Sequence, residues 1–254
     1  MYPAPFFIFF QPFFIALRQN FNGVNEVNGE GGMFARVGSA KTGNVFVELI
    51  LIVLGISIAL WFEGLAEDLQ EQGIAQQYLI GVRDDLQMDI RSLDAMIRNN
   101  QDRIDKLELT LAQLPRLHDA LPEVQAAAVF VPSSYHFFQP ANFTYMSMQE
   151  SGHFRLLSDP QIKRNLLKLM RRYQLIDELQ RNFIQALDDG YIPLMMGGFD
   201  ILTGHLVDST LPSSTRFRNF FAFALQDTGQ RVIVLKDAKS QASALLENIN
   251  EVIE

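Results

Sequence analysis

The amino-acid sequence predicts an all-α protein with one membrane-spanning helix near its N-terminus. An apolar stretch of eighteen residues, Val45–Phe62, is long enough to cross a bilayer. The next stretch, residues 67–114, contains no proline, and its apolar residues recur at helical spacing. No segment shows the sustained alternation of apolar and polar residues that indicates a sheet. We therefore expect the membrane helix to continue into a long helix, and residues 64–254 to form an antiparallel helical bundle with an aromatic- and proline-rich crossover.

The apolar stretch has the features of a membrane anchor. Eighteen helical residues rise about 27 Å, close to the roughly 30 Å of hydrocarbon in a bilayer. Its one charged residue, Glu48, lies near the start, where the carboxylate can reach the lipid headgroups. Trp61 lies at the opposite boundary, where aromatic residues of membrane helices are enriched. The sequence therefore predicts a transmembrane helix over residues 45–63.

Two other interpretations of this stretch are weaker. A cleaved signal sequence has a shorter apolar core and ends in small residues, whereas the nearest candidate site, Gly64–Ala66, follows Trp61, Phe62 and Glu63. A buried helix of a globular protein seldom lacks a polar face over four turns. An uncleaved anchor is the preferred interpretation.

The charges on either side of the anchor predict its orientation. Arg36 and Lys41 precede it, whereas no Lys or Arg follows it before Arg83. Positively charged flanks stay in the cytoplasm. We therefore expect a protein of the bacterial inner membrane, with a cytoplasmic N-terminus and a periplasmic C-terminal domain.

Two small residues in the anchor, Gly55 and Ala59, lie one helical turn apart. Such a pair allows another membrane helix to approach closely, although Gly and Ala are also simply common in membrane helices. Glu48 could likewise pair with a cation of a partner subunit, and an interfacial carboxylate is the preferred interpretation.

Residues 1–44 are expected to form a cytoplasmic or interfacial segment. Phe6–Leu17 is apolar but too short to span a bilayer, and Pro12 interrupts it. Residues 20–32 are rich in Asn and Gly, as linkers are. Because Met33 opens a conventional anchor sequence, we expect that residues 1–32 precede the natural start.

The long helix after the anchor carries a heptad pattern. Ile90, Ile97, Ile104 and Leu111 take position a, and Leu86, Leu93, Asn100, Leu107 and Leu114 take position d. This combination favours parallel dimers, in which Arg103 and Glu108 would pair between chains and Asp89 and Asp94 would repel. Met96 and Leu109 widen the stripe, which suits packing within one chain. An intramolecular bundle is preferred, a dimeric coiled coil is the alternative, and Asn100 either sets the register or bonds another helix.

Turn and capping residues divide the remaining chain. Four prolines between residues 115 and 140 prevent long helices in an aromatic-rich segment. A short helix is expected from an Asn142 cap to Glu150, ended by Gly152. Asp159 and Pro160 predict the start of a helix that stops at Gly190. Residues 190–213 are expected to be irregular, and Ser214 to cap a last helix reaching nearly to Glu254.

Two stretches of the sequence carry a resemblance to a known family. They are "ELILIVLGISIALWFE", which is the Glu-led anchor, and "TYMSMQESGHFRLLSDPQIKRNLLKLMRRYQ", residues 144–174, with its Ser151–Gly152 motif. In this order they resemble a family of uncharacterised bacterial single-span membrane proteins known only as a domain of unknown function. The resemblance covers Met33–Glu254. It implies the anchor and a helical outer domain, and it implies no activity.

The composition and the motifs exclude several kinds of site. The net charge of −8 belongs wholly to residues 63–254, which argues against nucleic acid as a partner. The absence of Cys excludes disulfides, thiol nucleophiles and Cys-ligated metals. Glu150 and His153 have di-iron spacing, but no second such pair exists, and Gly152 is expected to end the helix between them. We expect no cofactor and no metal, and Ser151, Gly152, Asp159 and Pro160 to be structural residues.

No catalytic motif is present, because the chain has neither a Gly-x-Ser-x-Gly elbow nor a phosphate-binding loop. A basic run on the helix after Asp159 could contact the acidic first helix, bind an anionic ligand or face water; it comprises Lys163, Arg164, Lys168, Arg171 and Arg172. We therefore expect a non-catalytic, membrane-anchored protein-interaction module, an accessory subunit with a membrane-protein partner or a second copy of itself. The alternatives are a ligand-sensing domain that acts through a partner and, less favoured, an enzyme.

Overall fold

The computed structural model describes the backbone of residues 40–253 and the side chains of residues 47–253. The expected start at Met33, the linker before it and the flanking charges of Arg36 and Lys41 lie outside the described side chains. The chain divides into two units, Met1–Trp61 and Phe62–Glu254. We call the second unit the helical domain and describe each unit by itself.

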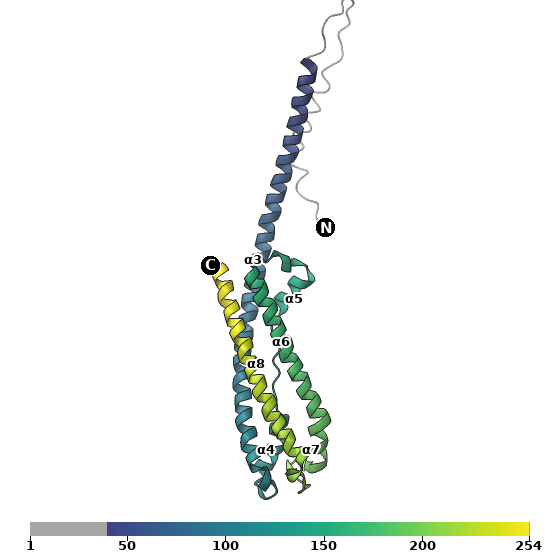
Figure 1. Ribbon diagram of the computed structural model, residues 1–254, viewed down its shortest axis with the longest axis vertical. Helices are drawn as coiled ribbons and strands as arrows, with labels where there is room; N and C mark the ends of the chain where they lie inside the picture. Colours follow the sequence, from purple (N-terminus) through teal and green to yellow (C-terminus); the bar gives the residue numbers. More distant parts are fainter. Residues whose placement is uncertain (1–39, 254) are drawn as a thin grey trace, which may run out of the picture. The chain divides into compact units, whose positions relative to one another are not determined.

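The described residues are almost entirely helical, which confirms the predicted all-α class (Figure 1). The strands in this part of the chain are β1 and β2, an antiparallel pair of two residues each. The elements are, in order, α3 (Ala40–Gln113), η1 (Leu114–Asp119), α4 (Pro122–Ser133), α5 (Phe143–Glu150), η2 (His153–Leu156), α6 (Pro160–Ala186), the π-helical turn η3 (Leu187–Tyr191), α7 (Ile192–Gly198), β1 (Phe199–Asp200), β2 (His205–Leu206), η4 (Leu211–Ser213) and α8 (Thr215–Ile253).

Three long helices, α3, α6 and α8, lie side by side in the helical domain (Figure 1). Along α3, Arg103 stacks on Phe183 of α6, whereas Asp89 lies near Tyr173 of the same helix, so α3 and α6 run parallel. Asp94 pairs with Lys239, and Arg103 donates to Thr228, so α8 runs antiparallel to α3. An antiparallel bundle was expected throughout. The α3–α6 pair differs because the crossover carries the chain back along the bundle before α6 begins.

The crossover, residues 134–142, has no regular structure, and side chains of the long helices bind its backbone. Gln180 accepts a hydrogen bond from the Phe138 amide at 2.6 Å and donates one to the Phe138 carbonyl at 3.2 Å. Asp89 accepts from the amide of Ala141 at 2.7 Å. Because buried amides need acceptors, these helix side chains allow an extended segment to lie in the core.

The buried seam of α3 lies one position away from the predicted one. Position d is buried as expected, but the second buried row is position g, and the Ile and Leu residues at position a are only half-buried; the buried members are Val82, Leu86, Asp89, Leu93, Asn100, Arg103, Leu107, Thr110 and Leu114. Arg103 and Asp89 therefore lie inside the chain, and the expected interchain roles of both residues were wrong. Asn100 bonds the Met96 carbonyl of its own helix at 2.8 Å rather than another helix.

Capping chemistry defines most helix ends as predicted. The Asp159 carboxylate accepts from the amides of Gln161 and Ile162 at the start of α6, and Pro160 occupies its first turn. Gly152, at φ 71°, follows α5 in the left-handed conformation. Ser214 accepts from the Phe217 amide at 3.3 Å. Asn142 precedes α5 but makes no side-chain cap.

Two expectations about the proline- and glycine-rich segments were wrong. α4 forms between prolines, because Pro122 occupies its first turn and Pro132 lies near its end. The chain does not stop being helical at Gly190: α6 passes through the π-helical turn η3 into α7. The region expected to be irregular therefore contains a helix, a short hairpin and the turn η4.

Candidate functional site

The apolar part of α3 is exposed along its whole described length. The large apolar side chains between Val47 and Phe62 are each 42–64% exposed. This part has a mean hydropathy of 2.3, and α3 is the one helix among the described residues that is long and apolar enough to cross a membrane. A helix that exposes this much apolar surface is stable in lipid rather than in water.

The four residues predicted for helix packing all lie in this part of α3. Glu48 and Trp61 are exposed, and Ala59 is half-buried. No described atom lies within 4 Å of the point where a side chain on Gly55 would begin. The predicted contact surface at Gly55 and Ala59 is therefore open to a neighbouring helix on the Gly55 side.

The Ser151–Gly152 motif forms a turn that packs on α3. The Tyr78 hydroxyl lies 3.2 Å from Ser151 Oγ and 3.1 Å from His153 Nδ1, and Ser151 Oγ donates to the Ser147 carbonyl at 2.8 Å. Beside the turn, Arg155 pairs with Glu71 at 2.6 Å. These contacts hold the turn against α3 and give Ser151 and Gly152 a structural role. Among the described residues no three His, Asp or Glu side chains are grouped as metal ligands.

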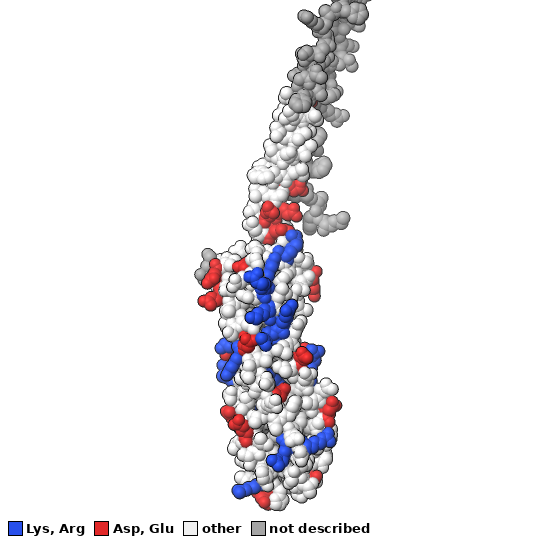
Figure 2. All heavy atoms as spheres, viewed as in Figure 1, with Lys and Arg blue, Asp and Glu red and all other residues white. Residues whose placement is uncertain are grey.

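Lys and Arg side chains gather in a stripe over part of α6 on the face drawn in Figure 2. Arg172 pairs with Asp237 of α8 at 2.7 Å, and Lys163 donates to the Arg155 carbonyl at 3.0 Å. Arg164, Lys168 and Arg171 are exposed. The basic run therefore pairs with α8 rather than with the acidic residues of α3, and its remainder faces water.

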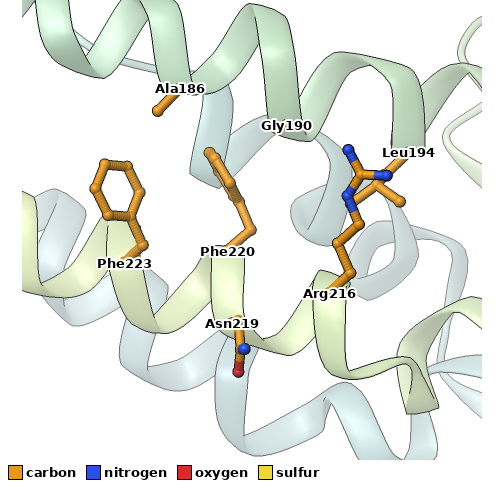
Figure 3. A pocket seen from close by; sticks show the side chains of 7 residues that line it. All are labelled: Ala186, Gly190, Leu194, Arg216, Asn219, Phe220 and Phe223. Carbon is orange, nitrogen blue, oxygen red and sulfur yellow. The ribbon is translucent and has the colours of Figure 1, made fainter.

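A shallow groove of about 250 Å³ lies between the end of α6 and the start of α8 (Figure 3). Its lining comprises Ala186, Gly190, Leu194, Arg216, Asn219, Phe220 and Phe223. Phe220 and Phe223 project from α8 toward α6, and Arg216 lies beside Leu194 at the other end (Figure 3). The walls are apolar, and Arg216 supplies a charge at the rim, so the groove suits an apolar side chain next to an acidic or carbonyl group.

The π-helical turn η3 forms one wall of this groove. Tyr191 is fully buried, stacks on Phe220 at 4.5 Å and donates to the carbonyl oxygens of Ala128 and Val129. The wider turn presents Gly190 to α8, where a side-chain carbon would lie 3.8 Å from the Phe220 ring. Single π-helical turns inside α-helices occur frequently at functional sites. The groove was not predicted, because its residues come from a region expected to be irregular.

Two arginines lie in the core of the helical domain. Arg103 is 5% exposed and Arg231 is 1% exposed, and both guanidinium groups stack on the Phe183 ring, at 4.6 and 5.0 Å. Arg103 donates to Thr228 Oγ1 and to the Pro132 carbonyl, each at 2.9 Å. We call Arg103, Arg231, Asp227, Tyr135 and Phe183 the arginine cluster.

The charges of the arginine cluster do not balance. Arg231 pairs with Asp227 one turn earlier on α8, and Asp227 supplies the single negative charge to two buried cations. Burial and the neighbouring Arg231 lower the pKa of Arg103 to about 10. Burial also raises the pKa of Asp227, and it outweighs the opposing effect of Arg231. The cluster thus holds a net positive charge at neutral pH.

Asp89 predicts a dependence of stability on pH. Burial raises the pKa of Asp89 above its usual 3.8, so the folded state binds this proton more tightly than the unfolded state does. The resulting stabilisation is present below about pH 4 and is lost as the pH rises through the folded-state pKa. Asp89→Asn keeps an acceptor for the Ala141 amide and removes the buried charge. We expect urea unfolding of the detergent-solubilised variant to show equal or up to about 1 kcal/mol greater stability than wild type at pH 7, with a smaller advantage at pH 4. An advantage that is the same at both pH values would contradict this prediction.

Comparisons with protein-family models, with curated proteins and with solved structures find no match to this chain. The resemblance to the single-span membrane family therefore stays a prediction, and the function has to be argued from the geometry described above.

Proposed function

We propose that this chain is a non-catalytic, membrane-anchored protein that binds another membrane protein, as an accessory subunit of a larger complex. Val45–Phe62 is the transmembrane anchor, residues 1–44 lie in the cytoplasm, and the helical domain lies in the periplasm. The acidic flank after the anchor supports this orientation, because Glu63, Glu67 and Asp68 follow it before any basic residue.

The observation that carries the proposal is the apolar groove between α6 and α8. Apolar grooves with a polar rim mark protein-binding surfaces more often than scattered exposed apolar residues do. Three exposed apolar side chains, Ile192, Met196 and Phe223, continue the apolar surface at and near the groove, at 44, 71 and 40% exposure. We infer that the partner inserts an apolar side chain between Phe220 and Leu194.

The experiment is purification of the tagged full-length protein from its native membrane in mild detergent, with the co-purifying proteins identified by mass spectrometry. We expect one membrane protein at stoichiometric amounts. Ala186→Trp fills the groove from the α6 side and is expected to weaken recovery of the partner at least tenfold, about 1.4 kcal/mol of binding free energy. Gly55→Leu with Ala59→Leu tests the anchor surface in the same way.

The matched control is Gln185→Trp, an exposed position adjacent in sequence that does not line the groove. It is expected to recover the partner as wild type does. Recovery of the protein alone from native membranes would overturn the proposal. Unchanged recovery with Ala186→Trp would exclude the groove as the binding surface, and unchanged recovery with the double Leu variant would exclude the Gly55 surface.

A second candidate, ligand sensing in the helical domain, is favoured by one observation. The arginine cluster carries an unbalanced buried charge, which an anionic ligand would neutralise.

A further inference from the structure

The arginine cluster contains most of the buried side-chain polar atoms that lack a hydrogen-bond partner among the described residues. Six such atoms are found, and four belong to the cluster: Arg103 Nε, Arg231 Nε, Arg231 Nη1 and the Tyr135 hydroxyl. All four can donate a hydrogen bond. Buried polar groups in native proteins are almost always bonded to protein, water or an ion, so a concentration of four free donors indicates a missing acceptor.

The unbalanced charge indicates what kind of acceptor is missing. A water molecule could bond these donors but would leave two buried guanidinium groups with the single carboxylate of Asp227. An anion bonds the donors and also neutralises the remaining positive charge, which is the larger cost in a medium of low dielectric. A neutral ligand would meet only one of these two requirements.

Burial limits the size of the anion. Arg231 is 1% exposed and Arg103 is 5% exposed, and the four donor atoms are shielded from solvent. Tyr135 is half-buried, belongs to the crossover and stacks on Phe137, whose centroid lies 4.1 Å away. Phe137 is 55% exposed, so this aromatic pair is the side of the cluster that faces solvent.

We propose that the helical domain binds one small monovalent anion of halide size between Arg103, Arg231 and the Tyr135 hydroxyl. Tyr135 and Phe137 of the crossover cover the site, and the anion enters when this segment moves. Binding ties the crossover to α3 and α8, because Tyr135 is the only donor of the three that the crossover supplies. The anion therefore stabilises the domain and orders residues 134–138.

The test measures thermal unfolding of the full-length protein in detergent at constant ionic strength, with sodium chloride replacing sodium gluconate. Gluconate is too large for an enclosed site, so screening stays constant while the anion changes. We expect a saturable rise in Tm with chloride, of about 5–10 °C at a concentration a hundredfold above the dissociation constant. Bromide is expected to act as chloride does.

Two variants assign the effect to the cluster. Arg231→Met keeps the length and the packing of the side chain and is expected to abolish the chloride-dependent rise. Tyr135→Phe removes one hydroxyl, preserves the ring stack and is expected to raise the chloride concentration at half-maximal stabilisation about tenfold. If Arg231→Met does not fold, Tyr135→Phe still tests the site.

Arg181→Met is the control, because Arg181 lies on the surface and is 70% exposed. It is expected to keep the full chloride response. The proposal is overturned if chloride and gluconate give the same Tm, or if Tyr135→Phe and Arg181→Met respond to chloride as wild type does.

Discussion

Replacing Asp227 with Asn is expected to lower the free energy of unfolding by about 3–5 kcal/mol. The Asp227 carboxylate pairs with Arg231 inside the helical domain, where its side chain is 10% exposed and that of Arg231 is 1% exposed. The substitution removes one negative charge and leaves two buried guanidinium groups that repel each other. Removal of one partner from a buried ion pair costs more than the pair contributes, since the remaining charge keeps its desolvation cost. Urea unfolding of the full-length protein in detergent, followed by circular dichroism, measures the effect.

Asp177→Asn is the matched control. Asp177 and Arg181 have the same spacing on α6 as Asp227 and Arg231 on α8, and they pair at 3.0 Å. Their side chains are 61 and 70% exposed, so this pair is expected to contribute less than about 0.5 kcal/mol. A loss below 1 kcal/mol for Asp227→Asn, or equal losses for the two variants, would show that the charge of Asp227 is not needed in the core.

The helix ends were predictable because their chemistry is local. Asp159 and Pro160 act on amides and backbone angles within three residues, and Gly152 adopts a conformation that its own lack of a side chain allows. The apolar stretch of α3 was equally clear, because composition alone identifies a helix that can cross a membrane. Each of these features depends on a short window of sequence.

The buried seam of α3 was not predictable, because its polar members find their partners far along the chain. Arg103 bonds Thr228 and Pro132, and Asp89 bonds Ala141. A hydrophobicity pattern places Ile at the seam and charged residues outside it, so it selects position a over position g. The parallel arrangement of α3 and α6 has the same origin, since it depends on the path of the crossover.

The groove and the arginine cluster also join distant segments, but α8 carried a local indication of the cluster. Asp227 and Arg231 lie on the same helical face as Ala224 and Leu235, which are both buried. A charged pair within an otherwise apolar stripe indicates a buried ion pair. Nothing in the sequence near Gly190 indicates the π-helical turn that shapes the groove.

Gln180→Leu is expected to lower the free energy of unfolding by about 2–5 kcal/mol. Gln180 is 3% exposed and bonds both the amide and the carbonyl oxygen of Phe138 in the crossover. Leu fills a similar volume, so the loss comes from two buried backbone groups left without partners, each costing about 1–3 kcal/mol. Urea unfolding measures the total, and hydrogen exchange at the Phe138 amide is expected to quicken more than exchange in α6.

Two further variants separate hydrogen bonding from packing. Gln180→Glu keeps an acceptor for the Phe138 amide but loses the donor to its carbonyl oxygen, and an intermediate loss is expected. Gln174→Leu, at an exposed position on the same helix, is expected to change stability by less than about 0.5 kcal/mol. If Gln180→Leu costs no more than Gln174→Leu, the crossover does not depend on Gln180 for its position. The side chains of Asp89 and Phe138 would then have to hold this segment, and with it Tyr135, against the long helices.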